Sequence, residues 1–563
     1  MSTSELRGAD LVVRVLERLG VRTVFSLSGN HIMPIYDALV ESSLRLIHAR
    51  HEAACVHMAD AYARLSGEVG VALVTGGQGH TNACAALFTA QATEAPLLLL
   101  SGHAGTNETG LGAFQELRQA AIAAPMTKAA WTAERADDLG HLLARAAGLA
   151  RSGRAGPVHV SLPVDLLESV LPDAAGLWPL PASAAAIPMP PSRSEISELL
   201  LHLQRAQRPL ILCGPGQSGA GGRTALRRLQ SQLSVPALVM ESPRGINDPT
   251  LGAFAEVLAE ADLVVLLGKP LDFTLKFGRA PFVAEGAGFI VVDADSHSVD
   301  RIESLGSKRL RLAMRAAPSE AIDALLATPD VTGARSVQLE WLARVEAAVR
   351  YRPSEWQSVT GSPATGRVHP LELCAALQRF IDGHAGTLLV CDGGEIGQWP
   401  QAAVEAPLRM INGVAGSIGP SLPFAIGASV VRQRDGVTAP VVVVMGDGTA
   451  GFHIAEFDTA VRYGLPVIVV IGNDARWNAE HQIQLRDYGA DRALHCELLP
   501  THYEQAAAAF GAHAEFVTDA SQLDGAFQRS RQSGKSACIN VMIESVPAPV
   551  IRRPATTMSG AQR

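Results

Sequence analysis

The chain has 563 residues, of which 47% are hydrophobic and 18% are charged, so it is long enough for three domains with large cores. Its net charge of −8 comes with no basic block, which argues against nucleic acid as the main partner. No apolar run approaches the roughly 18 residues of a membrane span, and the seven scattered cysteines suit reduced thiols better than disulfides. The composition predicts a soluble cytoplasmic α/β protein without a membrane partner.

The N-terminal residues 1–20 contain no apolar signal core and are typical of an amphipathic helix. Two stretches rich in small residues and proline, 178–194 and 351–370, are predicted to be extended linkers. They divide the chain into three consecutive α/β domains with parallel sheets, at 1–177, 195–350 and 368–550, and a tail at 551–563. The tail contains proline, serine and arginine, and both a lid and a disordered end remain open for it.

The first and third domains share a local pattern. Residues 70–102 and residues 440–473 each read as a strand, a glycine turn, a helix and a second strand led by proline. Each is typical of a βαβ unit, whose parallel strands need a crossover helix, here expected over 451–464 in the third domain. This similarity suggests duplication with division of labour, although any two βαβ units look alike.

The middle domain opens with a glycine-rich motif. Gly214, Gly216 and Gly219 form GxGxxG between a predicted strand and a predicted helix, and Glu241 follows the next strand. This is the context of a dinucleotide-binding fingerprint. A single match is weak, and a nucleotide fold that now binds nothing remains open as an alternative.

Two acidic residues follow neighbouring predicted strands of the third domain. Asp447 comes directly after VVVVMG, and Asp474 follows LPVIVVIG. Because ligands bind at the carboxyl ends of parallel strands, we expect both carboxylates to lie at one site. Carboxylate oxygens together with phosphates suit Mg²⁺, and a helix that follows Gly448 favours an anion. The sequence therefore predicts a metal and diphosphate site here.

The segment GDG-x24-ND, from Gly446 to Asp474, resembles the GDG-x(24–27)-NN signature of thiamine-diphosphate enzymes. The similarity spans the whole chain, in the order pyrimidine-binding, Rossmann-like middle and diphosphate-binding domain. It is greatest for the branch of acetolactate synthase, benzaldehyde lyase and 2-hydroxyacyl-CoA lyase. The stretches at 48–64, 112–128 and 416–428 support it. The departure is Asp474, where the family has asparagine, which puts the metal affinity or preference in question.

The resemblance implies roles for individual residues. Asp447, Asp474 and the carbonyl of Arg476 would hold Mg²⁺. Glu52, in RHEAA, would hydrogen-bond the aminopyrimidine ring of thiamine diphosphate, although by itself it reads as an acidic first-turn residue. Ile418 would support the bent cofactor, and the Gly416 carbonyl would accept from its amino group. The other implied cofactor contacts are Thr75, Gly394, Glu395, Gly446, Gly448, Thr449 and Trp477.

Five residues are predicted to face the reacting carbon and to select the reaction: Asn30, His31, Gln115, Trp477 and Glu480. Benzaldehyde lyase has a histidine at the place matching His31, and Gln115 matches a glutamine shared by synthases and that lyase. Glu480 follows Asp474 by six residues, the spacing of a catalytic glutamate in pyruvate decarboxylases. His31 also reads as a structural histidine, and Glu480 as a solvated helix residue.

In the middle domain, Lys269 stands where relatives commonly have arginine, and the segment is more similar to acyl-CoA enzymes than to FAD-binding ones. FAD is therefore doubtful, and an adenine nucleotide or a CoA moiety remains open there.

The leading hypothesis is a thiamine-diphosphate- and Mg²⁺-dependent lyase or carboligase acting on 2-hydroxy ketones and aldehydes, similar to benzaldehyde lyase. The alternatives are acetolactate-synthase-like condensation or decarboxylation of 2-oxo acids, a 2-hydroxyacyl-CoA lyase, and a non-catalytic regulatory subunit with the same fold. The family architecture implies a homodimer as the minimum and a homotetramer as the expected assembly, since the cofactor lies between domains of different subunits.

Overall fold

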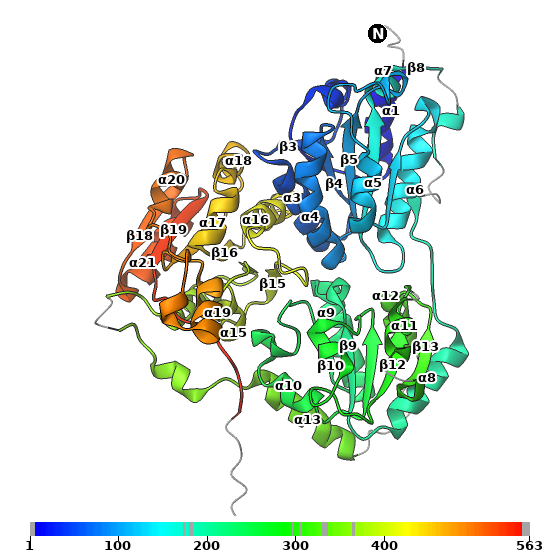
Figure 1. Cartoon of the computed structure of the whole chain (residues 1–563). Helices are drawn as coiled ribbons and strands as arrows, with labels where there is room; N and C mark the ends of the chain where they lie inside the picture. Colours follow the sequence, from blue (N-terminus) through cyan, green and yellow to red (C-terminus); the bar gives the residue numbers. More distant parts are fainter. Residues whose placement is uncertain are drawn as a thin grey trace, which may run out of the picture.

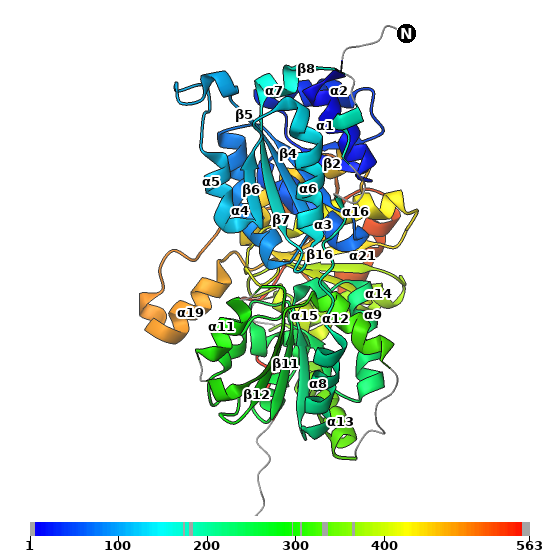
Figure 2. The same ribbon diagram turned by 90° about the vertical axis from the view of Figure 1, so that its right-hand side faces the viewer.

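A computed structural model describes residues 6–172, 175–179, 184–295, 297–304, 307–328, 336–362 and 366–553. Within them the chain forms three parallel-sheet α/β domains, which Figure 1 shows as a blue-cyan, a green and a yellow-red body. Figure 2 shows that the first domain stands directly above the middle domain. No helix of these ranges is both long enough and apolar enough to cross a membrane. The predicted fold class is confirmed.

The first domain contains a parallel sheet with the order β3-β2-β4-β5-β7-β6. Its strands are β2 (Thr23–Ser26), β3 (Arg45–His48), β4 (Gly70–Val74), β5 (Leu97–His103), β6 (Ala129–Thr132) and β7 (Pro157–Pro163). Its helices are α1 (Gly8–Arg18), α2 (Met33–Leu39), α3 (Glu52–Ser66), α4 (Gln78–Ala92), α5 (Gln119–Ala123), α6 (Leu139–Arg151) and α7 (Val164–Glu168). A short antiparallel pair, β1 (Leu6–Arg7) and β8 (Val170–Leu171), joins the two ends of the domain.

The middle domain has the strand order β10-β9-β11-β12-β13. Its strands are β9 (Pro209–Cys213), β10 (Ala237–Val239), β11 (Leu263–Leu267), β12 (Gly288–Val292) and β13 (Leu310–Met314). Its helices are α8 (Arg193–Arg205), α9 (Ala220–Leu233), α10 (Phe254–Leu258), α11 (His297–Glu303), α12 (Pro318–Ala327) and α13 (Ser336–Arg350). Helix α8 begins inside the predicted linker, because Ser192 and Glu195 form a capping box.

The third domain has the strand order β15-β14-β16-β17-β19-β18. Its strands are β14 (Leu388–Cys391), β15 (Leu408–Ile411), β16 (Val441–Gly446), β17 (Ile468–Asn473), β18 (His513–Val517) and β19 (Ala537–Met542). Its helices are α14 (Pro370–Asp382), α15 (Gln398–Ala403), α16 (Ser421–Arg434), α17 (Asp447–His453), α18 (Glu456–Arg462), α19 (Asn478–Tyr488), α20 (Tyr503–Ala509) and α21 (Leu523–Gln532).

The first and third sheets have the same topology. Counted from β2 in one domain and from β14 in the other, both strand orders are 2-1-3-4-6-5. The shared local pattern therefore extends to the whole sheet, whereas duplication itself stays a hypothesis. The helix expected over 451–464 differs from the prediction: it starts earlier and is divided into α17 and α18. At the division, Phe457 and Asp458 donate to carbonyls three residues back, which tightens the turn.

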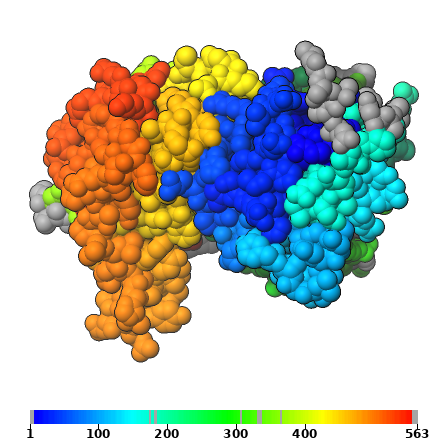
Figure 3. All heavy atoms as spheres, turned by 90° about the horizontal axis from the view of Figure 1, so that it is seen from above, coloured from blue at the N-terminus to red at the C-terminus, as the bar shows by residue number. Residues whose placement is uncertain are grey.

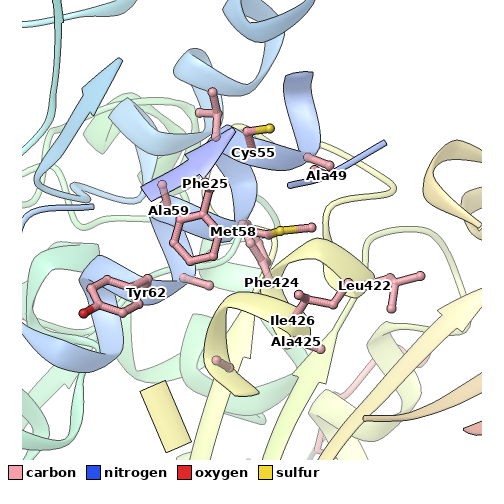
Figure 4. Close-up of a cluster of buried hydrophobic side chains, with 14 of the residues drawn as sticks. Phe25, Ala49, Cys55, Met58, Ala59, Tyr62, Leu422, Phe424, Ala425 and Ile426 are labelled. Carbon is pink, nitrogen blue, oxygen red and sulfur yellow. The ribbon is translucent and has the colours of Figure 1, made fainter. Parts of the chain in front are cut away.

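The core between the first and third domains is built on α3 and α16, which pack face to face. Met58 of α3 lies against Phe424 of α16, and Tyr62 packs edge-on against Phe25 in the same cluster (Figure 4). A Cβ added to Gly427 would lie 2.2 Å from the Met58 carbonyl oxygen, so this close approach of two helices requires glycine. The packing fixes the carboxyl ends of both sheets relative to each other.

Candidate active site

A cavity of about 210 Å³ lies at the carboxyl ends of β14, β16 and β17. All twelve third-domain residues that the sequence singles out line it: Gly394, Glu395, Gly416, Ile418, Gly446, Asp447, Gly448, Thr449, Asp474, Arg476, Trp477 and Glu480. The neighbouring parallel strands β16 and β17 end at Gly446 and Asn473, which brings the two acidic residues to one edge, as predicted.

Asp447 and Asp474 are buried, with 1% and 6% of their surface exposed. Burial raises the pKa of both carboxyl groups above their ordinary range, and the charge of Asp474 raises that of Asp447 further. Among the described residues, Oδ2 of Asp447 has no hydrogen-bond partner. Buried carboxylate oxygens normally have partners, so this arrangement is typical of a cation site.

The turn after Asp474 has an unusual backbone. Ala475 adopts a φ of +58°, a conformation that alanine rarely takes, and its amide donates to Oδ1 of Asn473 at 3.1 Å. The turn places Trp477 against Gly448, where an added Cβ would lie 2.7 Å from the indole ring. The second glycine of GDG is therefore required by the tryptophan, a pairing that sequence spacing does not reveal.

The loops that carry Gly394 and Ile418 are held by Asp392, which the sequence interpretation missed. Its buried carboxylate accepts from the amides of Gly393 at 2.6 Å and Gly419 at 3.0 Å. A Cβ on Gly393 would lie 2.7 Å from Ile418. The signal was present in CDGG, where an acidic residue ends a buried strand before two glycines.

The outer rim of the cavity includes Arg244 from the middle domain, together with Glu395 and Glu480. Burial raises the pKa of Glu395, and the Arg244 charge opposes this shift. Oε2 of Glu395 accepts from the amide of Ala548 at 2.8 Å, so the chain passes over the rim before the tail begins. Residues 554–563 of the predicted tail lie outside the described residues.

A second cluster lies in the first domain. Glu52 begins α3, and its Oε2 accepts from Nδ2 of Asn82 at 3.0 Å. Gly79 separates Glu52 from Thr75: an added Cβ would lie 3.3 Å from Glu52 Oε1 and 2.8 Å from Thr75 Cγ2. Nδ1 of His31 lies 3.4 Å from Oγ1 of Thr75, within hydrogen-bond distance. The structure thus brings Glu52, Thr75 and His31 together.

Gln115 and Phe114 complete this cluster. Gln115 has a φ of +57°. A Cβ added to Gly77 would lie 2.6 Å from the Cβ of Gln115. The exposed ring of Phe114 stacks on buried His31 with centroids 6.0 Å apart. Strained residues of this kind concentrate at functional sites. Asn30 is exposed at the start of the same short helix as His31, away from the contacts described.

Gln119 was also missed by the sequence interpretation. Its buried amide accepts from the Gly77 amide at 2.8 Å and donates to the Gly102 carbonyl and to Ser161 Oγ, both at 3.0 Å. It therefore ties together segments at the ends of β4, β5 and β7, and it shares its neighbour Gly77 with Gln115. A polar residue four positions from another polar residue gives no sequence signal for such a role.

The two clusters do not share one cavity. None of the first-domain residues Asn30, His31, Glu52, Thr75 and Gln115 lines the third-domain cavity, within the part of the chain that the structure describes. Each half is rimmed by exposed large apolar side chains, Phe114 at one and Phe452 at the other. Exposed aromatic residues beside a half-formed site are typical of a surface that another chain covers.

The third-domain cavity fits a divalent ion and a diphosphate. It supplies two carboxylates, one with an oxygen that has no partner in the described ranges, and a glycine-lined wall in which Gly394 and Gly416 adopt φ of +75° and +70°. Within the part of the chain that the structure describes, nothing lies within 4 Å of a Cβ built on Gly394, so the backbone there is open to a ligand. Oxygen ligands and open backbone are the features that Mg²⁺-bound phosphates need.

The glycine-rich turn of the middle domain does not fit a dinucleotide. It lies between β9 and β11, where the strand order reverses and where open α/β sheets bind ligands. The carboxylate of Glu94, from the first domain, accepts from the Gly216 amide at 3.1 Å. Arg154, also from the first domain, donates to the same carboxylate at 2.9 Å. A protein carboxylate therefore lies where the fingerprint would place a phosphate.

Two other residues that the sequence singled out in this domain, Glu241 and Lys269, also bind protein groups. Glu241 is buried between Arg223 and Arg409, at 2.5 and 3.2 Å, and Arg409 belongs to β15 of the third domain. Lys269 is buried and donates to Thr274 at 2.6 Å and to Asp272 at 3.2 Å. The crevice of the middle sheet thus binds the two neighbouring domains rather than leaving groups free for FAD or an adenine nucleotide.

We expect Glu94→Ala to lower the thermal unfolding midpoint, because it leaves Arg154 without this partner and opens the interface. Breaking a fully buried ion pair costs about 3 kcal/mol. Arg154 is 26% exposed and also lies 3.8 Å from Asp293, so the loss here should be smaller. Glu94→Gln, which retains an acceptor oxygen, should cost less still. Differential scanning calorimetry measures both. Added FAD or ADP should leave the wild-type midpoint unchanged. An unaltered midpoint in Glu94→Ala, or a rise with ADP, would contradict this assignment.

Comparison with known proteins identifies the family. The N-terminal, central and C-terminal domain models of the thiamine pyrophosphate enzymes match residues 6–122, 196–325 and 392–541. The chain is 30% identical to the acetolactate synthase large subunit IlvG of Mycobacterium tuberculosis, covering 95% of each chain. It is 30% identical to 2-hydroxyacyl-CoA lyase 2 of Homo sapiens, covering 95% of this chain and 90% of the relative. The protein of Caenorhabditis elegans with the same name is 29% identical over similar shares. The chain is therefore a thiamine-diphosphate-dependent enzyme of the branch that contains the acetolactate synthases and the 2-hydroxyacyl-CoA lyases.

Proposed function

We propose that this enzyme makes or breaks a carbon–carbon bond next to a carbonyl group, as a lyase or carboligase of 2-hydroxy ketones and aldehydes. The proposal is carried by His31, which is buried, lies 3.4 Å from Thr75 and stacks on Phe114 beside the Glu52 cluster. Burial lowers its pKa, so the ring is neutral near pH 7 and can accept a proton from a substrate hydroxyl.

The cofactor is proposed to bind in the third-domain cavity. Asp447, Asp474 and the Arg476 carbonyl would hold Mg²⁺, while Gly446, Gly448, Thr449, Gly394 and Glu395 would surround the diphosphate. Ile418 would support the bend between the two rings, and the Gly416 carbonyl would accept from the amino group. Thiamine diphosphate supplies an electron sink for the carbon next to the carbonyl.

The remaining roles concern protons and substrate. Glu52 would hold a proton at the pyrimidine ring, and His31 would take the proton of the substrate hydroxyl. Gln115, with Asn30 and Trp477 at the edges, would hydrogen-bond or contact the substrate. In the decarboxylase alternative, Glu480 would donate a proton to the product. These assignments rest on the two clusters of side chains and on the family resemblance.

The two clusters are proposed to meet across subunits. Glu52 and Asp447 of one site would come from different chains, which makes a homodimer the minimum active form and a homotetramer a natural assembly. The separate half-sites and the exposed rings of Phe114 and Phe452 support this arrangement.

Two other reactions are supported by the relatives' names. Condensation of 2-oxo acids would match the acetolactate synthase relative, and cleavage of a 2-hydroxyacyl-CoA would match the human relative. Glu480, which lines the cavity, additionally fits simple decarboxylation of 2-oxo acids.

Product analysis by mass spectrometry separates these reactions. The purified protein, with thiamine diphosphate and Mg²⁺, is offered benzoin, simple aldehydes, pyruvate, benzoylformate and a 2-hydroxyacyl-CoA. We expect benzoin cleavage or aldehyde coupling without release of CO₂, and a loss of about 100-fold in this reaction for His31→Ala. Products that appear only from 2-oxo acids with CO₂, or only from the acyl-CoA, would replace the lyase proposal with the corresponding alternative.

A further inference from the structure

Glu456 of the third domain contacts the segment that precedes Glu52 in the same chain. This carboxylate has 1% of its surface exposed and accepts from the Arg50 amide at 3.0 Å. Its other oxygen accepts from Thr459 Oγ1 at 2.6 Å. The bond to Arg50 joins residues 406 positions apart in the chain, at the start of α18 and just before α3.

Two further bonds reach the same segment from the end of α18. The His48 amide donates to the Tyr463 hydroxyl at 2.9 Å, and Arg462 Nη2 donates to the His48 carbonyl at 2.7 Å. Figure 1 shows α18 beside β3, and Figure 3 shows the yellow-orange third domain packed directly against the blue first domain. All three contacts end on backbone atoms of the four residues before Glu52.

This segment needs support that its own sheet does not give. Strand β3 is an edge strand, with β2 as its neighbour on one side only, and it ends at His48. Apolar packing between α3 and α16 already joins the two domains. A buried carboxylate adds little net stability to a domain interface, because removing its charge from water costs free energy. Its bonds to backbone groups instead fix the position of a short segment.

We infer that Glu456 is a positioning residue, which holds the backbone at Arg50 so that Glu52 points into its cluster. The inference rests on the proposed role of Glu52. Segment α17–α18 begins at Asp447 and reaches Glu456 nine residues later, so one continuous piece of chain carries the proposed metal ligand and fixes the proposed proton-handling residue.

The test uses the full-length protein and compares Glu456→Ala, Glu456→Gln and Asp458→Asn. Asp458 lies on the same helix, pairs with the Arg50 side chain at 3.5 Å and accepts from Arg462 Nε at 2.7 Å. An asparagine oxygen can still accept from Arg462, so Asp458→Asn removes the charge but not the Glu456 bond to the Arg50 amide, and it is the matched control. Hydrogen–deuterium exchange of the apoprotein reports on residues 48–53. We expect exchange there to accelerate about tenfold or more in Glu456→Ala, less in Glu456→Gln, and not in Asp458→Asn.

In the loaded enzyme, Glu456→Ala should lower kcat about 10- to 100-fold, as small misplacements of reacting groups do. The dissociation constant of thiamine diphosphate with Mg²⁺, from Trp fluorescence, should stay at the wild-type value, and Glu456→Gln should recover part of kcat. If residues 48–53 of Glu456→Ala exchange at the wild-type rate, the inference is overturned. A loss of cofactor affinity as large as the loss in kcat would also overturn it. If the wild type itself shows no thiamine-diphosphate-dependent turnover, the proposed function fails, while the exchange result still decides the contact.

Discussion

Glu52→Gln is expected to reduce turnover by about 100-fold or more, while the affinity for thiamine diphosphate and Mg²⁺ changes far less. Glutamine has nearly the same shape and keeps an oxygen to accept from Asn82, which now donates to Glu52 at 3.0 Å. It cannot, however, carry a carboxyl proton. Because the proposed metal and diphosphate contacts all lie in the third-domain cavity, most of the cofactor affinity should survive the change.

The measurement pairs steady-state kinetics with the rate at which the C2 proton of bound thiamine diphosphate exchanges with deuterated solvent. Both rates should fall together in Glu52→Gln. Asn82→Ala serves as the matched variant, because it removes the partner of the carboxylate but not the carboxylate itself, and its loss should be smaller. Unchanged turnover in Glu52→Gln would show that the residue is only a first-turn acid of α3.

Asp447→Asn is expected to abolish Mg²⁺-dependent cofactor binding without destabilising the apoprotein. The wild type buries an oxygen of this carboxylate without a hydrogen-bond partner in the described residues, and burial raises its pKa. Neutralising it should leave the unfolding midpoint of the apoprotein at or above the wild-type value. The buried charge serves the binding of an ion and does not stabilise the protein without one. Ligand at 100 times its dissociation constant stabilises a protein by about 2.7 kcal/mol, and the variant should lose this gain.

Thermal unfolding with and without cofactor, Mg²⁺ and EDTA measures this effect. The control is Asp474→Asn, which restores the amide that the resembled family has at this position and should retain Mg²⁺ binding. A variant Asp447→Asn that is still stabilised by the cofactor in a manner sensitive to EDTA would contradict the proposed ligand. Equal loss in both variants would show that this chain needs both charges.

The two variants together also test the proposed sharing of sites. If Glu52 and Asp447 of one site come from different chains, a mixed dimer of the two inactive variants contains one intact site. Random exchange gives about half mixed dimers, and hence about a quarter of the wild-type activity. Two sites each built within one chain would leave the mixture inactive.

The strands and their ends were predictable because buried parallel strands are continuous apolar runs. The strands β16 and β17 were predicted from the runs VVVVMG and LPVIVVIG. The βαβ connection predicted that the two strands end at the same edge of the sheet. The division between α17 and α18 was not predictable, since Ile454 and Ala455 are ordinary helix residues and only the hydrogen-bond pattern changes there.

Site residues were predictable when their contacts lie close to them in the sequence, and not when those contacts are far away. Cavity-lining residues next to a glycine turn, such as Asp447 and Gly394, were predicted from spacing and family resemblance. Asp392, Gln119 and Glu456 were missed because each acts through backbone groups far away in the sequence. The sequence also could not show that Glu94 occupies the GxGxxG turn, since the motif describes the turn and not the group that lies on it.

The carboxylate on that turn has a further consequence. Glu94 belongs to the same chain as Gly216, so it competes with any dissolved anion at a fixed local concentration. Groups joined by a chain reach effective concentrations of about millimolar or more, and they lose no translational freedom on binding. A nucleotide would have to displace Glu94, leave Arg154 without this partner and separate two packed domains. Any nucleotide at this turn would therefore have to bind tightly enough to offset the loss of these contacts.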